Sequence, residues 1–139
     1  MVVVAAGNDG RDIDYSPEFP ASFNISTQIT VAASSVSDFM TSWSNSGFQT
    51  AHVAAPGERI LSTVPQAGTA YMDGTSMAAP FVSGAAALLW SARPQASALQ
   101  IKSALLQSID AIPGREFKVS SRGRINVAKA LQILRQTVP

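Results

Sequence analysis

The hydrophobic pattern begins with three short apolar runs that are typical of strands in a parallel sheet. Val2–Ala6 is continuous, rich in β-branched residues and stopped by the turn sequence Gly7-Asn8-Asp9-Gly10. Gln28–Ala33 and His52–Ala55 have the same character, and Pro56-Gly57 closes the third run. Short apolar runs without polar alternation indicate strands covered on both faces, so all three are expected inside a sheet.

Three later segments follow helical patterns. Ser76–Ala92 is apolar nearly all round, which predicts a helix buried in a large core, with Pro80 in its first turn. Ser97–Ile109 has apolar residues at helical spacing, and Ser97 with Gln100 forms a capping-box pattern. Asn126 is expected to cap a last helix. The fold class is therefore α/β, a parallel sheet with helices on both faces. These few elements cannot cover both faces, so the chain is expected to be part of a larger domain.

Composition narrows the classes of function. The chain has 139 residues, 46% of them hydrophobic, which suits one domain with a sizeable core. Ten basic residues balance nine acidic ones without a basic cluster, so no nucleic-acid partner is expected. The absence of cysteine excludes disulfides and a cysteine nucleophile, and a single histidine excludes the usual structural zinc sites. The longest apolar stretch, Ala78–Ala92, is too short and too interrupted to span a membrane, and Met1 does not open a recognisable signal peptide.

Two short motifs carry candidate chemistry. In Gly74-Thr75-Ser76, the serine falls at a helix N-terminus, where free N–H groups stabilise an oxyanion, and the glycine leaves room for a substrate backbone. In Ala5-Ala6-Gly7-Asn8, a strand end presents an asparagine amide that suits a second oxyanion donor. Taken singly, the first motif is better explained as an ordinary serine cap and the second as an ordinary turn.

Read together, GTSMAAP and AAGN resemble the motifs of the subtilisin-like serine proteases, or subtilases. Other segments match that family in the same order: residues 19–22 (FPAS), 29–33 (ITVAA), 43–47 (WSNSG), 54–57 (AAPG), 60–65 (ILSTVP) and 123–127 (GRINV). The resemblance implies that residues 1–139 are the C-terminal portion of a subtilase catalytic domain. It further implies a polypeptide substrate, hydrolysis through an acyl-enzyme and a secreted parent protein.

The resemblance also assigns roles to single residues. Ser76 becomes the nucleophile and Asn8 the oxyanion-hole side chain. The substrate-binding residues become Ala5, Ala6 and Gly7 as a wall of the specificity pocket, Glu18 near its base, and Gly74 with Thr75 beside the nucleophile. For Glu18, a solvated loop charge is the alternative. The peptide bond before Pro20 is expected to be cis.

The catalytic aspartate and histidine of the family lie N-terminal to AAGN, and this sequence begins at that point. His52 stands in a strand-like segment and is interpreted as a structural histidine rather than the general base. The expected partner is therefore the N-terminal half of the catalytic domain, or another copy of the chain. Two alternatives stay open, namely an inactive pseudo-protease module that binds a partner and a serine hydrolase that uses another base.

No cofactor is required by this chemistry, but one cation is considered. Asp9, Asp12 and Asp14 are closely spaced oxygen donors of the kind that bind calcium, and calcium sites are common among subtilases. Turn-forming aspartates explain the same spacing, so no metal ligand is assigned.

Overall fold

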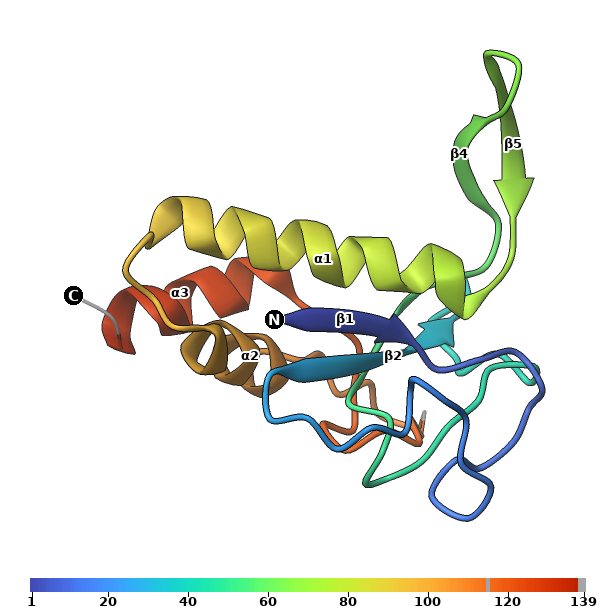
Figure 1. Ribbon diagram of the computed structural model, residues 1–139, viewed down its shortest axis with the longest axis horizontal. Helices are drawn as coiled ribbons and strands as arrows, with labels where there is room; N and C mark the ends of the chain where they lie inside the picture. The colour runs from blue at the N-terminus through green and yellow to red at the C-terminus, as the bar shows by residue number, and fades with distance from the viewer. Residues whose placement is uncertain (115, 138–139) are drawn as a thin grey trace.

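A computed structural model describes residues 1–114 and 116–137 and contains a parallel sheet of three strands (Figure 1). Strand β1 (Val2–Ala5) pairs with β2 (Gln28–Ser34), and β2 pairs with β3 (Val53–Pro56), both in parallel. The predicted strands are confirmed with shifts of a residue at some ends, and His52 lies just before β3.

The middle strand carries the core. Every residue of β2 is buried, and its side chains alternate between two hydrophobic clusters because successive residues point to opposite faces. Strand β1 has a neighbour on one side only, and Val2 is 50% exposed. The expectation that the first run lies inside the sheet is therefore wrong for the described residues, because their sheet ends at this strand. Both faces of β1 are nevertheless in contact with the core, since Val3 packs against one hydrophobic cluster and Val4 against the other.

The described residues form three helices, all on one face of the sheet: α1 (Thr75–Ala92), α2 (Ala98–Gln107) and α3 (Val127–Thr137). Helix α1 packs across all three strands, and α2 and α3 pack against it and against each other (Figure 1). Loop residues such as Ile13 and Phe117 cover the opposite face. The predicted parallel α/β architecture is confirmed, but the described residues do not form the expected second helical layer.

The helix signals in the sequence are largely confirmed. The Ser97 hydroxyl accepts the Gln100 N–H at 3.3 Å, and the Gln100 side chain accepts the Ser97 N–H at 2.8 Å. Asn126 accepts the Lys129 N–H at 3.0 Å and so caps α3. Pro80 lies beyond the first turn, because α1 begins at Thr75. Its ring nitrogen cannot donate to the carbonyl four residues earlier, in Ser76.

Two features of the surface differ from the sequence predictions. The outer face of α1 is exposed rather than buried, with Phe81 at 45% and Leu88 at 54%. A hairpin of β4 (Ile60–Val64) and β5 (Gly68–Met72) projects from the body of the molecule (Figure 1). The hydrophobic pattern did not predict this hairpin, because its turn places Gln66 and Ala67 at positive φ instead of the usual glycine or asparagine. No described helix has the length and hydrophobicity needed to cross a bilayer.

Candidate active site

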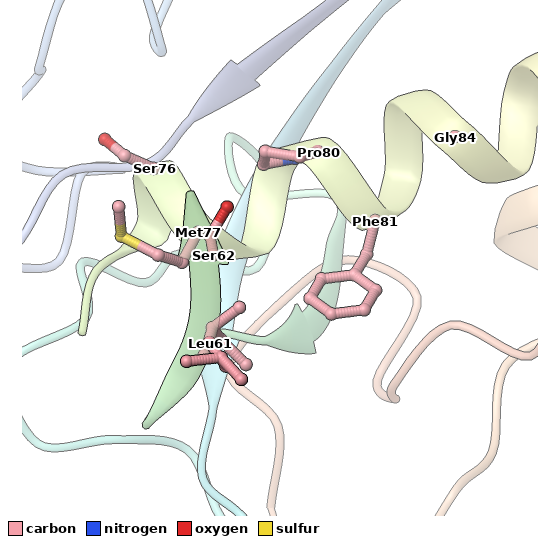
Figure 2. Close-up of a pocket in the computed structure, with 8 residues that line it drawn as sticks. Leu61, Ser62, Ser76, Met77, Pro80, Phe81 and Gly84 are labelled. Atoms are coloured by element: carbon pink, nitrogen blue, oxygen red, sulfur yellow. The ribbon is translucent and has the colours of Figure 1, made fainter. Parts of the chain in front are cut away.

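Ser76 lies at the N-terminal end of α1, as the sequence predicts. Gly74 precedes the helix and is buried together with Thr75, whereas Ser76 is exposed. Figure 2 shows its hydroxyl pointing away from the helix. The Thr75 N–H donates to Asn8, and the N–H groups of Met77 and Ala78 donate to Gly74. Within the described chain the Ser76 N–H has no acceptor, so it is available to a ligand at the positive end of the helix dipole.

Asn8 is held against the start of α1 by Thr75. The Thr75 N–H and hydroxyl both donate to Asn8 Oδ1 at 2.9 Å, and the Thr75 hydroxyl accepts the Gly7 N–H at 3.1 Å. Because Oδ1 faces two donors, the amide nitrogen of Asn8 must point the other way. It lies beside the turn that precedes α1, 3.7 Å from the position that a Cβ on Gly74 would take. In the described residues, this amide has no acceptor and is a second free donor near Ser76.

Gly57 connects the turn before α1 to the sheet, a contact that the sequence does not reveal. Its N–H donates to the Ser34 carbonyl at 3.0 Å, and its own carbonyl accepts the Gly74 N–H at 2.9 Å. A Cβ on Gly57 would lie 2.6 Å from the Cβ of Ala33 and 2.8 Å from the Gly74 carbonyl oxygen. Only glycine fits this contact. The turn signal at Pro56-Gly57 was visible in the sequence, but its contact with residue 74 was not.

A groove runs from Ser76 along α1. It is an open, mainly apolar cavity of about 490 Å³ between α1 and β4. Figure 2 shows Leu61 of β4 and Phe81 of α1 beside the same space. The lining residues are Ile60, Leu61, Ser62, Ser76, Met77, Pro80, Phe81 and Gly84. An apolar segment of polypeptide could therefore bind directly next to the serine.

The predicted substrate-binding residues on the β1 side are only partly free. Ala5 ends β1, Ala6 is buried behind it, and Gly7 turns the chain with a φ of 103°. Glu18 lies next to Gly7, with its Cγ 3.4 Å from the position of a Cβ there. Arg11 forms ion pairs with Asp9 at 2.9 Å and with Glu18 at 2.8 Å, and these carboxylates raise its pKa. Glu18 is thus adjacent to the predicted wall but is already paired. The Phe19–Pro20 bond is cis, as predicted.

His52 lies far from Ser76. Its Nδ1 accepts the Thr30 N–H at 2.9 Å, and its Nε2 is 3.4 Å from Nζ of Lys102. Burial, with a contribution from the Lys102 charge, lowers the pKa of His52 to about 4. Thr30 is about 13 Å along β2 from Ser34, the end of the strand that is linked through Gly57 to the turn before α1. The interpretation of His52 as a structural residue is consistent with this position.

The three closely spaced aspartates each have a protein partner. Asp9 pairs with Arg11, and Asp12 accepts the Asp14 N–H at 3.0 Å. Asp14 accepts the N–H groups of residues 49 and 50 at 3.0 and 2.8 Å. Burial acts to raise the pKa of Asp14, but these hydrogen bonds outweigh it and lower the pKa. Among residues 1–114 and 116–137, no three acidic or histidine side chains gather as a metal site would require. The geometry fits turn-forming aspartates.

A serine at a helix N-terminus with an asparagine amide beside it is an arrangement of donors that suits the stabilisation of an oxyanion. The sequence model of the Subtilase family matches residues 1–129, and the chain belongs to this family. It is 40% identical over 132 residues to Thermitase of Thermoactinomyces vulgaris, which covers 95% of this chain and 44% of that protein. The solved structure of the prenylagaramide maturation protease PagA superposes with a TM-score of 0.81 at 32% identity, covering 96% of this chain and 50% of PagA.

The chain spans about half the length, or less, of the relatives that it matches. Relatives are named for different compartments. The extracellular serine proteinase of a Thermus strain is 44% identical over 108 residues, covering 76% of this chain and 25% of that protein. The major intracellular serine protease of Bacillus subtilis is 43% identical over 91 residues, which cover 64% of this chain and 28% of that protein.

Proposed function

We propose that this chain is the nucleophile-bearing portion of a subtilisin-like serine endopeptidase. Ser76 is the nucleophile, and the oxyanion is held by the Ser76 N–H and the Asn8 amide. The observation that carries this proposal is the double hydrogen bond from Thr75 to Asn8 Oδ1, which leaves the Asn8 amide nitrogen free as a donor beside the serine.

The proposed reaction follows from these positions. A general base removes the proton from Ser76 Oγ, which attacks the carbonyl carbon of a peptide bond. Negative charge then develops on the carbonyl oxygen, where the two fixed donors stabilise it. The tetrahedral intermediate expels the amine, which takes the proton back from the base, and water hydrolyses the acyl-enzyme in the same way. Gly74, which has no side chain, lets the substrate backbone approach the serine.

His52, the only histidine of the sequence, cannot act as the base for Ser76, because it lies at the other end of β2. We propose that the N-terminal half of a subtilase domain supplies this base. Its docking surface is the edge of β1 with the exposed apolar face of α1 and the groove beside Ser76. The coverage of only about half of Thermitase and PagA supports this proposal. In a subtilisin, removing the base lowers turnover about 10⁶-fold.

The alternative is a module that binds the same partner without catalysis. The surfaces would be identical, so only activity separates the two functions. For the parent protein a secreted location is also a proposal, since its relatives are named both as extracellular and as intracellular proteases.

The test is hydrolysis of a chromogenic peptide by the chain alone and by the chain mixed with a complementary fragment. By complementary fragment we mean the part of Thermitase that lies N-terminal to the region similar to this chain. We expect turnover only from the mixture, lost on Ser76→Ala and kept on Ser83→Ala. Ser83 is an exposed serine of the same helix and serves as the matched control. A mixture that binds but does not turn over would favour the binding module. Turnover by the chain alone would show that another base acts.

A further inference from the structure

A buried asparagine between β2 and β3 holds the loop that carries Asn8. Asn45 is 0% exposed. It lies in the segment 43–47, which matches the subtilase sequences but to which the resemblance assigns no role. Asn45 contacts neither the nucleophile nor the side chain of Asn8 through any hydrogen bond of the described residues, so its part in the site is indirect.

Four hydrogen bonds connect Asn45 to the backbone around Asn8. Its Nδ2 donates to the Ala6 carbonyl at 3.0 Å, and its backbone N–H donates to the Gly7 carbonyl at 2.9 Å. Its Oδ1 accepts the N–H groups of Asp9 and Arg11 at 3.1 and 2.9 Å. One side chain thus bonds the residues on both sides of Asn8.

The packing around this amide leaves little freedom. A Cβ on Gly7 would lie only 2.4 Å from Nδ2 of Asn45, so the loop backbone rests directly on the amide group. Deleting the amide would leave the Ala6 carbonyl and the two N–H groups without their partners. Unpaired backbone groups are costly when they are buried, and the loop would have to move to regain partners or water.

Asn8 is therefore fixed from two sides. Thr75 holds its Oδ1 from α1, and Asn45 holds the backbone that carries it from the β2–β3 connection. Thr75 holds Asn8 Oδ1 and the Gly7 N–H, whereas the backbone N–H groups of Asp9 and Arg11, on the other side of Asn8, are held by Asn45. We infer that Asn45 is a positioning residue for the oxyanion hole, which aims the Asn8 amide at the developing charge without touching substrate. This inference rests on the proposed function.

A double-mutant cycle in the mixture with the complementary fragment tests the coupling. We expect Asn45→Ala to lower kcat about 10- to 100-fold, the scale of a displacement near 1 Å in a catalytic group, while KM changes less than about twofold. In the Asn8→Ala background the same change is expected to cost less than about threefold, because its target is gone. Asn45→Asp keeps the acceptor for Asp9 and Arg11 and should recover part of the loss. Asn24→Ala, at an exposed asparagine, is the matched control.

An equal loss in both backgrounds would overturn the inference, since it would show a general structural role. No loss in either background would overturn it as well. Hydrogen exchange provides a readout that needs no activity. Asn45→Ala should speed exchange of the Asp9 and Arg11 N–H groups at least about tenfold and leave the amides of β2 unchanged. An unchanged exchange rate at both positions would refute the positioning role. An equal loss of protection at all amides of the chain would refute it as well. If the unmutated mixture shows no turnover, the proposed function fails, while exchange still decides the role of Asn45.

Discussion

Two adjacent leucines of α1 test the proposed docking surface. Leu88 is 54% exposed on the outer face, whereas Leu89 is fully buried in the core formed by the sheet and the helices. The residue type, the helix and the substitution to alanine are the same, so the pair separates the effect of the partner from that of the core.

The structure sets the expected magnitudes. Leu89→Ala removes a fully buried side chain, which costs about 2–5 kcal/mol, out of a total stability of about 5–15 kcal/mol for a typical domain. Burying a whole leucine contributes about 1.5–3 kcal/mol, so the exposed half of Leu88 can contribute about 1 kcal/mol when a partner covers it. This corresponds to a loss of about fivefold in affinity for the partner on Leu88→Ala.

The assay combines size exclusion, binding of an apolar dye and calorimetric titration with the complementary fragment. We expect the chain alone to self-associate and bind dye, because the free edge of β1 and the apolar face of α1 are exposed. The fragment should order it, Leu88→Ala should weaken that binding about fivefold, and Leu89→Ala should prevent ordering. A monomer with a sharp cooperative melt and no bound dye would refute the need for a partner. Unchanged affinity on Leu88→Ala would remove the α1 face from the interface.

Three further predictions concern single side chains of the chain bound to the fragment. Asn8→Ala should lower kcat about 10²–10³-fold, the range found for the oxyanion-hole asparagine of a subtilisin, and an unchanged rate would exclude Asn8 from the oxyanion hole. His52 has a folded pKa of about 4, below the ordinary 6.5, so the unfolded chain takes up the proton first. The contribution of neutral His52 to the free energy of unfolding should be complete above pH 6.5 and lost as the pH falls to 4. The expected loss is about 2 kcal/mol, a value lowered to allow for solvent screening of this partly exposed side chain. Unfolding by urea between these pH values checks this, and the same pH slope in His52→Gln would contradict it. If Glu18 lines the specificity pocket, Arg11→Gln should free its carboxylate and increase cleavage after Lys or Arg, whereas Glu18→Gln should decrease it, and a cleavage profile unmoved by both would remove Glu18 from the pocket.

Local rules explain the parts of the fold that the sequence predicted. The apolar runs around Val3 and Val31 are strands because β-branched residues suit a pleated backbone, and turn residues end them. The capping box at Ser97 and the helix start near Ser76 depend on residues within one turn, so a linear pattern shows them. The neighbourhood of Asn8 and Ser76 came from the family resemblance and not from the pattern.

Contacts between distant segments escaped the sequence analysis. Asn45 lies 37 residues from Asn8 in the sequence, and Gly57 lies 17 residues from Gly74. Nothing local marks either as part of the site, because their partners are backbone groups brought together by the sheet. The exposure of Leu88 was missed for a related reason. The sequence pattern predicts a buried apolar helix, whereas in the described residues nothing covers the outer face of α1 at Leu88.

The central claim is that Ser76 is a nucleophile which becomes active only when a partner supplies the base. Labelling by a fluorophosphonate probe, with the modified residue located by mass spectrometry, tests it most directly. The claim predicts modification of Ser76 at least about 10²-fold faster in the presence of the complementary fragment than in its absence, the scale of general-base catalysis. The claim also predicts no labelling of the Ser76→Ala variant. Equally fast labelling of Ser76 with and without the fragment, or no labelling while the fragment is bound, would contradict it.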